Sequence, residues 1–337
     1  MAGIWIAAAV ACAATAALLL ILDRCAAPTF LVAAITPRSN HAHRPRQLGG
    51  LGLSAAWLVA AAAVGLAGGV SGGAAGWIGA AIALLVVVGF LDDVRHRPAL
   101  FRLAVHAAAA ALALSAFPRL IPDLGPVLPS ASGTVLAMLV LVASINIVNF
   151  MDGLDLMSVA GAGIPLAFAA MALSGQGDAG MIALLAAGAA GGLLAFAGFN
   201  RPPARMFLGD SGSLPLGLVC GLAILALHDL HGGLAGLVPF AYYAVDSLST
   251  LALRAARLQP FWQAHSQHAY QKAYRAGLSA WRISGLVALL SLACGLGLLS
   301  AEPAGIWAGW YLPVAATLLA AVLTLHFRLA APGRAKT

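Results

Sequence analysis

Residues 74–95 read AAGWIGAAIALLVVVGFLDDVR, an apolar run that ends abruptly in two aspartates and an arginine. A helix needs about 20 apolar residues to cross the hydrocarbon core of a bilayer, which is about 30 Å thick, and 74–91 meets this requirement. Asp92, Asp93 and Arg95 then follow at the membrane surface. The stretch predicts a membrane-spanning helix with an ionisable end.

The rest of the chain has the same character. Of 337 residues, 62% are hydrophobic and only 9% are charged, whereas soluble domains carry about 25% charged residues. So few charges cannot form a water-soluble surface, and most of the chain must be solvated by lipid. We predict an all-α, polytopic membrane protein with eleven spans, at residues 4–22, 50–69, 74–91, 102–117, 132–148, 157–174, 179–198, 212–228, 234–253, 282–300 and 306–327.

The first span, 4–22, has no basic segment before it and no small-residue cleavage site after it, so we expect it to be retained. We expect 1–337 to form a single integral membrane domain. The four cysteines are isolated from one another and indicate neither a disulfide framework nor a zinc site.

The basic residues predict the orientation of the bundle. With the N-terminus periplasmic and the C-terminus cytoplasmic, every Lys and Arg except Arg119 falls on the cytoplasmic side. This is the bias that the positive-inside rule describes. We expect a multi-pass protein of a bacterial inner membrane. The formal net charge of +7 therefore follows from topology and requires no nucleic acid; it also favours anionic headgroups and phosphorylated ligands.

The acidic residues gather on the same side. Acids in the predicted periplasmic loops are isolated, and Asp246 lies inside the ninth predicted span. Carboxylates near a membrane are costly and mark functional sites. Five of those at the cytoplasmic span ends form three groups: Asp92 with Asp93, Asp152 with Asp155, and Asp210. We predict an active site on the cytoplasmic face.

The first group allows two interpretations. Adjacent carboxylates suit a divalent cation or a shared proton, because either relieves their repulsion. Arg95 and Arg97 can instead neutralise Asp92 and Asp93 at an ordinary solvated helix end. Taken alone, the pair favours the second interpretation.

The second group is the run Asn146-x-x-Asn149-x-x-Asp152-Gly153-x-Asp155. In a helix, side chains three apart share a face, which would form a ridge of two amides and two carboxylates. A polar loop with an Asp-Gly turn is the alternative. Such a ridge directly below an apolar span favours a site.

The third group is Phe207-Leu-Gly-Asp-Ser-Gly-Ser213, in which Gly209 and Gly212 flank Asp210. This composition offers backbone N–H groups and oxygen ligands to a phosphate–Mg²⁺ unit. It also suits a helix N-terminus capped by Asp210 or Ser211, and both interpretations can hold together.

His265 and His268 lie three residues apart in the longest cytoplasmic loop. No nearby cysteine or carboxylate completes a zinc site, so imidazoles beside phosphate are the favoured interpretation, although such a pair carries little information alone. Oxygen ligands favour Mg²⁺, with Mn²⁺ as the alternative. The chain lacks the G-x-x-x-x-G-K-[ST] phosphate loop, which argues against ATP-driven work.

These four motifs, in this order and with eleven spans, resemble the polyprenyl-phosphate N-acetylhexosamine-1-phosphate transferases of glycosyltransferase family 4. That superfamily includes enzymes that start lipid-linked O-antigen and the phospho-MurNAc-pentapeptide translocase. The similarity covers residues 36–285, and the loop Trp262-Gln-Ala-His-Ser-Gln-His-Ala-Tyr-Gln271 is most similar to the O-antigen-initiating branch.

The resemblance implies a reaction. Undecaprenyl phosphate and a UDP-N-acetyl sugar, UDP-GlcNAc or a 6-deoxy relative, would give the lipid diphosphate-sugar and UMP with Mg²⁺. Membrane lipids would be further partners, and a homodimer stays open. The start of a cell-envelope polysaccharide such as O-antigen would be the biological outcome.

The resemblance also implies roles for individual residues. Asp210 and Asp92 would contact the metal, and Asp92 would accept a proton from the lipid phosphate or position it. Asp155 would lie at the uracil and Phe207 would stack on it. The catalytic set is Asp92, Asp93, Asp152, Asp210 and His265. The substrate-binding set is Arg46, Arg102, Asn149, Gly153, Asp155, Arg205, Phe207 and His268.

Two features depart from the family pattern. Positions near the aspartate pair that are often lysine are arginine here, among them Arg102. The histidine motif is H-S-Q-H instead of three consecutive histidines, which argues against the pentapeptide-translocase branch. The competing class is a proton-coupled transporter or flippase, which would place acids near mid-span and contain internal repeats.

Overall fold

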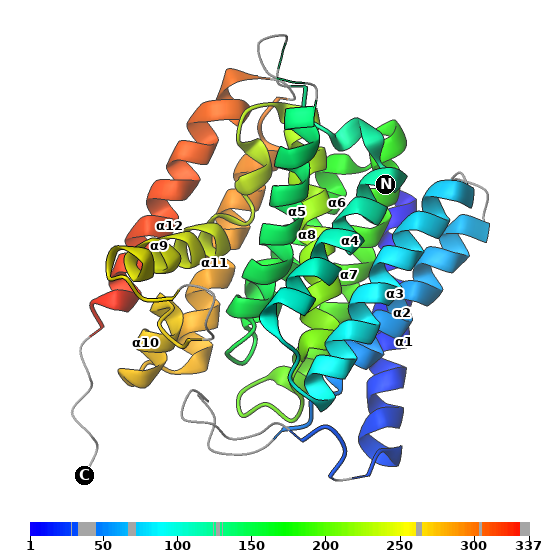
Figure 1. Ribbon diagram of the computed structural model, residues 1–337, viewed down its shortest axis with the longest axis vertical. Coiled ribbons are helices and arrows are strands. Elements are labelled where there is room, and N and C mark those ends of the chain that lie inside the picture. Colours follow the sequence, from blue (N-terminus) through cyan, green and yellow to red (C-terminus); the bar gives the residue numbers. More distant parts are fainter. Residues whose placement is uncertain are drawn as a thin grey trace.

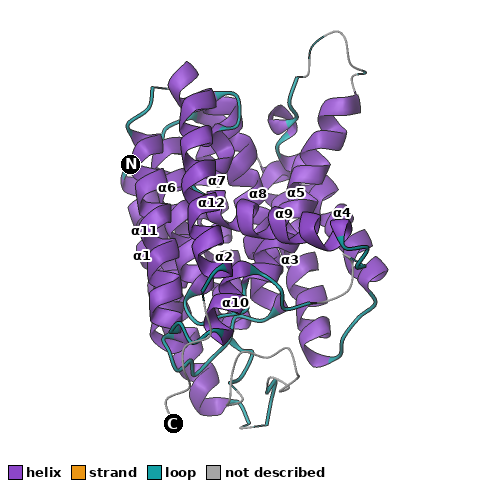
Figure 2. Cartoon of the chain, turned by 90° about the vertical axis from the view of Figure 1, so that its left-hand side faces the viewer, coloured by secondary structure: helices purple, strands orange, loops and turns teal. Residues whose placement is uncertain are grey.

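The computed structural model describes residues 1–27, 29–32, 45–66, 72–123, 125, 129, 131–260, 265–302 and 305–330. These ranges form a helical bundle without strands (Figures 1 and 2). The helices are α1 (Ala2–Cys25), α2 (Gly49–Leu66), α3 (Gly72–Val94), α4 (Ala99–Ala116), α5 (Ala131–Met151), α6 (Ile164–Leu173), α7 (Gly180–Asn200), α8 (Asp210–His231), α9 (Ala241–Ala256), α10 (Ala269–Arg275), α11 (Ala280–Leu299) and α12 (Leu312–Arg328).

Eight of the helices in the described ranges are long and apolar enough to cross a membrane: α1, α3, α4, α5, α7, α8, α11, and α12 with the π-helical turn before it. The chain is therefore a multi-pass membrane protein, as predicted. Each predicted span contains a helix, but the count of eleven, the orientation and the single domain stay predictions. Residues 67–69 of the second predicted span lie outside the described residues.

The ninth predicted span, 234–253, differs most from expectation. Its helix, α9, has 16 residues and begins only at Ala241. At 1.5 Å per residue it extends about 24 Å, less than the hydrocarbon core of about 30 Å. Figure 1 shows it lying across the long helices. One face is polar and buried against the protein, with Asp246, Ser247, Thr250 and Arg254 at 0–6% exposure.

The centre of the bundle is α8, most of whose residues are buried. It packs against α3 and α5, and small residues allow the close approach. A Cβ at Gly89 of α3 would lie 2.3 Å from the backbone oxygen of Asp210, and one at Gly217 would lie 2.5 Å from the Cα of Ile145 in α5. The start of α8 is therefore fixed beside the ends of α3 and α5.

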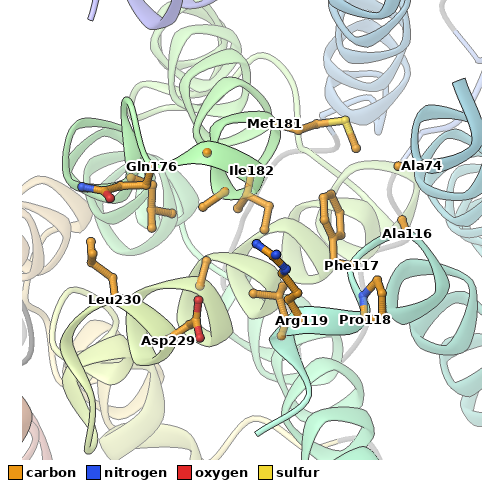
Figure 3. A pocket seen from close by; sticks show the side chains of 15 residues that line it. Ala74, Ala116, Phe117, Pro118, Arg119, Gln176, Met181, Ile182, Asp229 and Leu230 are labelled. Atoms are coloured by element: carbon orange, nitrogen blue, oxygen red, sulfur yellow. The ribbon is translucent and has the colours of Figure 1, made fainter. Parts of the chain in front are cut away.

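The opposite end of the bundle holds a cavity of about 570 Å³. It lies between the end of α4, the start of α7 and the end of α8, and Figure 3 shows Phe117, Arg119, Ile182 and Asp229 around it. None of the predicted site residues lines this cavity. The site and the cavity occupy opposite ends of the same helices.

The contact between Gly89 and α8 gives a test of this packing. Gly89→Ala should lower the melting temperature in detergent, because overpacking a tight contact costs about 1–3 kcal/mol. Gly76→Ala on the same helix is the matched control, since a Cβ there meets nothing within 4 Å. Equal melting temperatures for the two variants would contradict the close α3–α8 contact.

Candidate active site

The site is built around the first turn of α8. Asp93, at the end of α3, accepts hydrogen bonds from the backbone N–H of Asp210 (2.8 Å) and of Ser211 (3.0 Å). Gly209 has φ +72°, and a Cβ there would lie 2.8 Å from a carboxylate oxygen of Asp93. A helix does begin at Asp210, but its capping acceptor comes from α3 and not from Asp210 or Ser211. Asp93 therefore fixes the backbone that carries Asp210.

The side chains of Asp92 and Asp210 both lie near the guanidinium group of Arg102. The Nη1 atom of Arg102 lies 3.5 Å from Asp92 Oδ2 and 3.7 Å from Asp210 Oδ2. Asp92 also accepts from the backbone N–H of Arg97 at 2.6 Å, and its side chain is only 6% exposed. The structure thus brings both predicted metal ligands to one point, together with the predicted substrate contact Arg102.

Asn149 joins this cluster from α5. Its Nδ2 donates to Asp210 Oδ1 at 2.8 Å and to Ser213 Oγ at 3.0 Å. Asn146, one turn earlier, faces away: its Nδ2 lies 3.2 Å from His106 Nδ1 on α4. The expected ridge is therefore divided: the two amides lie on α5 but contact different helices, and the two carboxylates follow after α5 ends at Met151.

Asp152 and Asp155 lie in the turn after α5. Ser158 donates its hydroxyl to Asp152. Burial raises the pKa of Asp152 to about 7 against this opposing hydrogen bond, and the charges of Asp93 and Asp155 raise it too. Asp155 is 4% exposed and accepts from the backbone N–H of Ala204 at 3.1 Å. Asp155, expected at the uracil, thus ties the α5 turn to the loop before α8.

Arg46, Arg205 and Phe207 lie together at the edge of the site. The N–H of Phe207 donates to the carbonyl of Arg46 at 2.9 Å, and the N–H of Gly49 donates to that of Phe207 at 3.0 Å. Both guanidinium groups donate to the carboxylate of Asp23, at the end of α1. These contacts join the loop before α2 to the loop before α8. Residues 38–44 of this predicted loop lie outside the described residues.

Asp23 is the residue that sequence reasoning missed. It belongs to none of the four motifs, and a single acid after an apolar span is unremarkable in a sequence. The Asp and Arg residues are far apart in the chain, so only the fold brings them together.

The two histidines form a second cluster against the end of α5. The rings of His265 and His268 have their centres 4.9 Å apart, and the Phe150 ring lies 6.4 and 6.3 Å from them. Burial lowers the pKa of His265 to about 4, and the charges of His268 and Arg254 act in the same direction. His265 is therefore neutral near pH 7 and can both donate and accept a hydrogen bond. Residues 261–264 of this loop lie outside the described residues.

Gly153 leaves room for an aromatic side chain. A Cβ at this position would lie 2.4 Å from the hydroxyl oxygen of Tyr270. That hydroxyl donates to the carbonyl of Phe150 at 3.0 Å. Gly153, expected to bind substrate, thus allows α10 to pack against the end of α5.

The donor set suits a hard cation carried by a phosphate. Within the part of the chain that the structure describes, no group of three His, Cys, Asp or Glu side chains forms a cage for a metal ion. Mg²⁺ in phosphate-handling sites commonly takes one or two protein carboxylates, completing its shell with water and phosphate oxygens. Asp92 and Asp210, both within reach of one guanidinium, fit this pattern.

The fold and the site together define the class of the protein. It is an integral membrane protein with a polar site, formed by convergent carboxylates, at one end of its helical bundle. Residues 75–228 match the family model described as Glycosyl transferase family 4. Over these residues the chain is similar to this family, and it is also similar to phospho-N-acetylmuramoyl-pentapeptide-transferases.

Three relatives illustrate the similarity. The chain is 42% identical over 121 residues to a phospho-N-acetylmuramoyl-pentapeptide-transferase of Heliobacterium modesticaldum, covering 34% of this chain and 35% of that protein. A Moorella thermoacetica protein of the same name is 42% identical over 123 residues, covering 35% and 36%. One from Thermobifida fusca is 33% identical over 198 residues, covering 52% and 56%. The chain therefore spans between about a third and just over half of the length of these relatives.

The capping role of Asp93 can be tested without substrate. Asp93→Ala should lower the melting temperature in detergent, because leaving buried N–H groups unpaired costs about 1–3 kcal/mol. Asp93→Asn keeps one carbonyl acceptor and should fall between the wild type and the alanine variant. Asp123→Ala removes an exposed aspartate that accepts only a local hydrogen bond, from Gly125, and serves as the control. An alanine variant at position 93 that melts like the control would show that α8 does not depend on this cap.

Proposed function

We propose that the chain transfers N-acetylhexosamine-1-phosphate from a UDP-sugar to undecaprenyl phosphate and releases UMP, with Mg²⁺ as its cofactor. The observation that carries the proposal is the convergence of Asp92, Asp210, Arg102 and Asn149 at one end of a membrane bundle. A phosphate attached to a lipid anchor can reach such a site from the bilayer, while a nucleotide sugar enters from water. Similarity to the family over residues 75–228 supports the same reaction class.

The reaction is a phosphoryl transfer. An oxygen of the lipid phosphate attacks the β-phosphorus of the UDP-sugar, and the bond from that phosphorus to the bridging oxygen breaks, so that UMP leaves with the electron pair. Mg²⁺, when bound with the diphosphate, would neutralise charge that grows on the phosphate oxygens. Asp210 and Asp92 would hold the ion, and Asn149 keeps Asp210 oriented through its 2.8 Å hydrogen bond.

Arg102 has two roles in this proposal, one toward the carboxylates and one toward the substrate. It balances the two carboxylates in the structure, and a guanidinium is also well suited to phosphate oxygens. Asp92 and Asp210 would hold the cation, and the guanidinium of Arg102 would then be available to contact the lipid phosphate.

We assign Asp92 a positioning role. A phosphate monoester has a second pKa of about 6, so the attacking phosphate is mostly ionised at neutral pH and needs no strong base. The contacts of Asp92 with Arg102, with His96 at 3.3 Å and with the Arg97 backbone also hold its carboxylate in place. Asp152 and Asp93 then contribute by fixing the surrounding backbone.

The nucleotide side of the site would be formed by Phe207, Arg46 and Arg205, with Asp155 supporting the loop beneath them. Arg205 lies with its Cζ 5.5 Å from the Phe199 ring centre and is exposed, which leaves it near water and the entering substrate. His265 and His268 would face the diphosphate and the sugar from the other side of α5.

We propose a small N-acetyl sugar, UDP-GlcNAc or a 6-deoxy relative, because the histidine loop reads H-S-Q-H. The relatives described above are named for a pentapeptide substrate, and the proposal separates this chain from them on that loop. The start of an O-antigen or a similar envelope polysaccharide is the corresponding pathway step.

The transporter alternative receives less support. It requires carboxylates available for protonation along a path through the membrane. Asp246, the one acid predicted inside a span, is fully buried and bonded to four donors beside α10. Such a carboxylate is held in place and not exposed to a water-filled path.

The reaction can be tested with purified protein, undecaprenyl phosphate, Mg²⁺ and a panel of UDP-sugars, following UMP release. Asp210→Asn should lower the rate by about a hundredfold or more, since it removes a charged group that acts in the transition state. Asp229→Asn is the matched control, because Asp229 lies at the far end of the same helix and is exposed. Chelation with EDTA should stop the wild-type reaction, and added Mg²⁺ should restore it.

Full activity of Asp210→Asn would refute the metal assignment. A wild-type protein that releases no UMP with any sugar of the panel would refute the proposed reaction.

A further inference from the structure

Asp246 is a buried carboxylate that belongs to none of the motifs. It lies on α9 and is 0% exposed. Within α9, Tyr242 donates its hydroxyl to Oδ2 at 3.0 Å and Thr250 donates to Oδ1 at 3.1 Å. An ionised carboxylate in such a place is costly unless it is fully hydrogen-bonded, and this one accepts from four donors.

The other two donors are the first backbone N–H groups of α10. The N–H of Ala269 donates to Oδ1 at 2.9 Å, and that of Tyr270 donates to Oδ2 at 3.3 Å. The N–H groups of a first helical turn have no partner inside the helix and carry partial positive charge. A carboxylate from α9 therefore satisfies the start of α10 and joins two helices that follow each other across the histidine loop.

The same carboxylate faces a histidine of the site. His268 comes directly before α10, and its Nδ1 lies 3.6 Å from Asp246 Oδ1. A carboxylate at this ion-pair distance attracts the ring, most strongly when the ring is protonated. The His268 side chain also accepts from the backbone N–H of Gln271 at the start of α10, so the ring is held from two sides. The ring is further packed against Phe150, His265 and Tyr270.

The first turn of α10 also contacts the end of α5. Tyr270, whose N–H is held by Asp246, donates its hydroxyl to the carbonyl of Phe150, the neighbour of Asn149. Asp246 thus holds one short helix whose first residues touch both the histidine cluster and the end of α5.

We propose that Asp246 is a positioning residue of the active site, which acts through His268 and α10; this inference rests on the proposed transferase function. Asp246 sets the ring orientation of His268 and the distance between the histidine loop and the cluster around Asn149. It does not touch the reacting atoms.

The first test needs no substrate. In hydrogen–deuterium exchange of the full chain in detergent, Asp246→Asn should make the amides of Ala269 and Tyr270 exchange about tenfold faster, because an amide nitrogen replaces one acceptor. Tyr242→Phe is the matched control: it removes a donor to the same carboxylate but leaves α10 untouched. Asp246→Glu keeps the charge and is a second variant should Asp246→Asn not be recovered folded; its longer side chain must displace the start of α10 and raise the same exchange rates.

The second test is a double-mutant cycle on UMP release. Asp246→Asn alone should lower kcat by about tenfold to a hundredfold, the range found when the orienting partner of a functional histidine is removed. In a His268→Gln background the same change should lower kcat by less than about twofold, because the residue through which Asp246 acts is already gone. Tyr242→Phe should leave kcat near the wild-type value.

The outcomes separate the two proposals. Exchange rates at 269 and 270 that stay at the wild-type value in both Asp246 variants would overturn the positioning role, as would equal fold-losses of kcat in the two backgrounds. A wild-type protein inactive with every UDP-sugar would refute the transferase proposal, and the exchange experiment would then still decide whether Asp246 holds α10.

Discussion

The hydrogen bonds from the backbone N–H groups of Asp210 and Ser211 to Asp93 are the constraint on which the site depends. They join the end of one membrane helix to the beginning of another, where neither helix can satisfy its own polar groups with lipid. The close contact at Gly89 keeps α3 and α8 together behind them. In the structure that this crossing fixes, the carboxylates of Asp92 and Asp210 lie 3.5 and 3.7 Å from the same Nη1 atom of Arg102.

The features that depend on residue type and on the order of the motifs along the chain could be predicted from the sequence. A low charge content requires a membrane bundle, and oxygen-rich motifs at span ends predict a site at one end of it. The convergence of Asp92, Asp210 and Asn149 was therefore within reach of prediction. The ends at which the motifs lie place them at one end of the bundle, whereas the contacts between individual atoms depend on packing.

What could not be predicted depends on contacts between distant segments. The catalytic role predicted for Asp93 stays a prediction, but its cap on α8 could not be foreseen, because only the fold shows which N–H groups surround it. Asp23 had no motif around it. The span predicted at 234–253 became the shorter α9, since the polar face that contains Asp246 packs against protein. Hydropathy averages along the chain and does not register which face of a helix is polar.

The end of α5 connects both halves of the site. Asn149 faces the carboxylate cluster on α8, while the next residue, Phe150, contacts the histidine rings and accepts from Tyr270. Successive residues of a helix point about 100° apart, so one turn of α5 can face two different partners. A displacement of α10 would therefore be transmitted to Asn149 through the carbonyl of Phe150. Three carboxylates, at positions 23, 93 and 246, hold the segments that carry the reactive groups. Asp23 pairs with two guanidinium groups, whereas Asp93 and Asp246 accept from the first backbone N–H groups of α8 and α10.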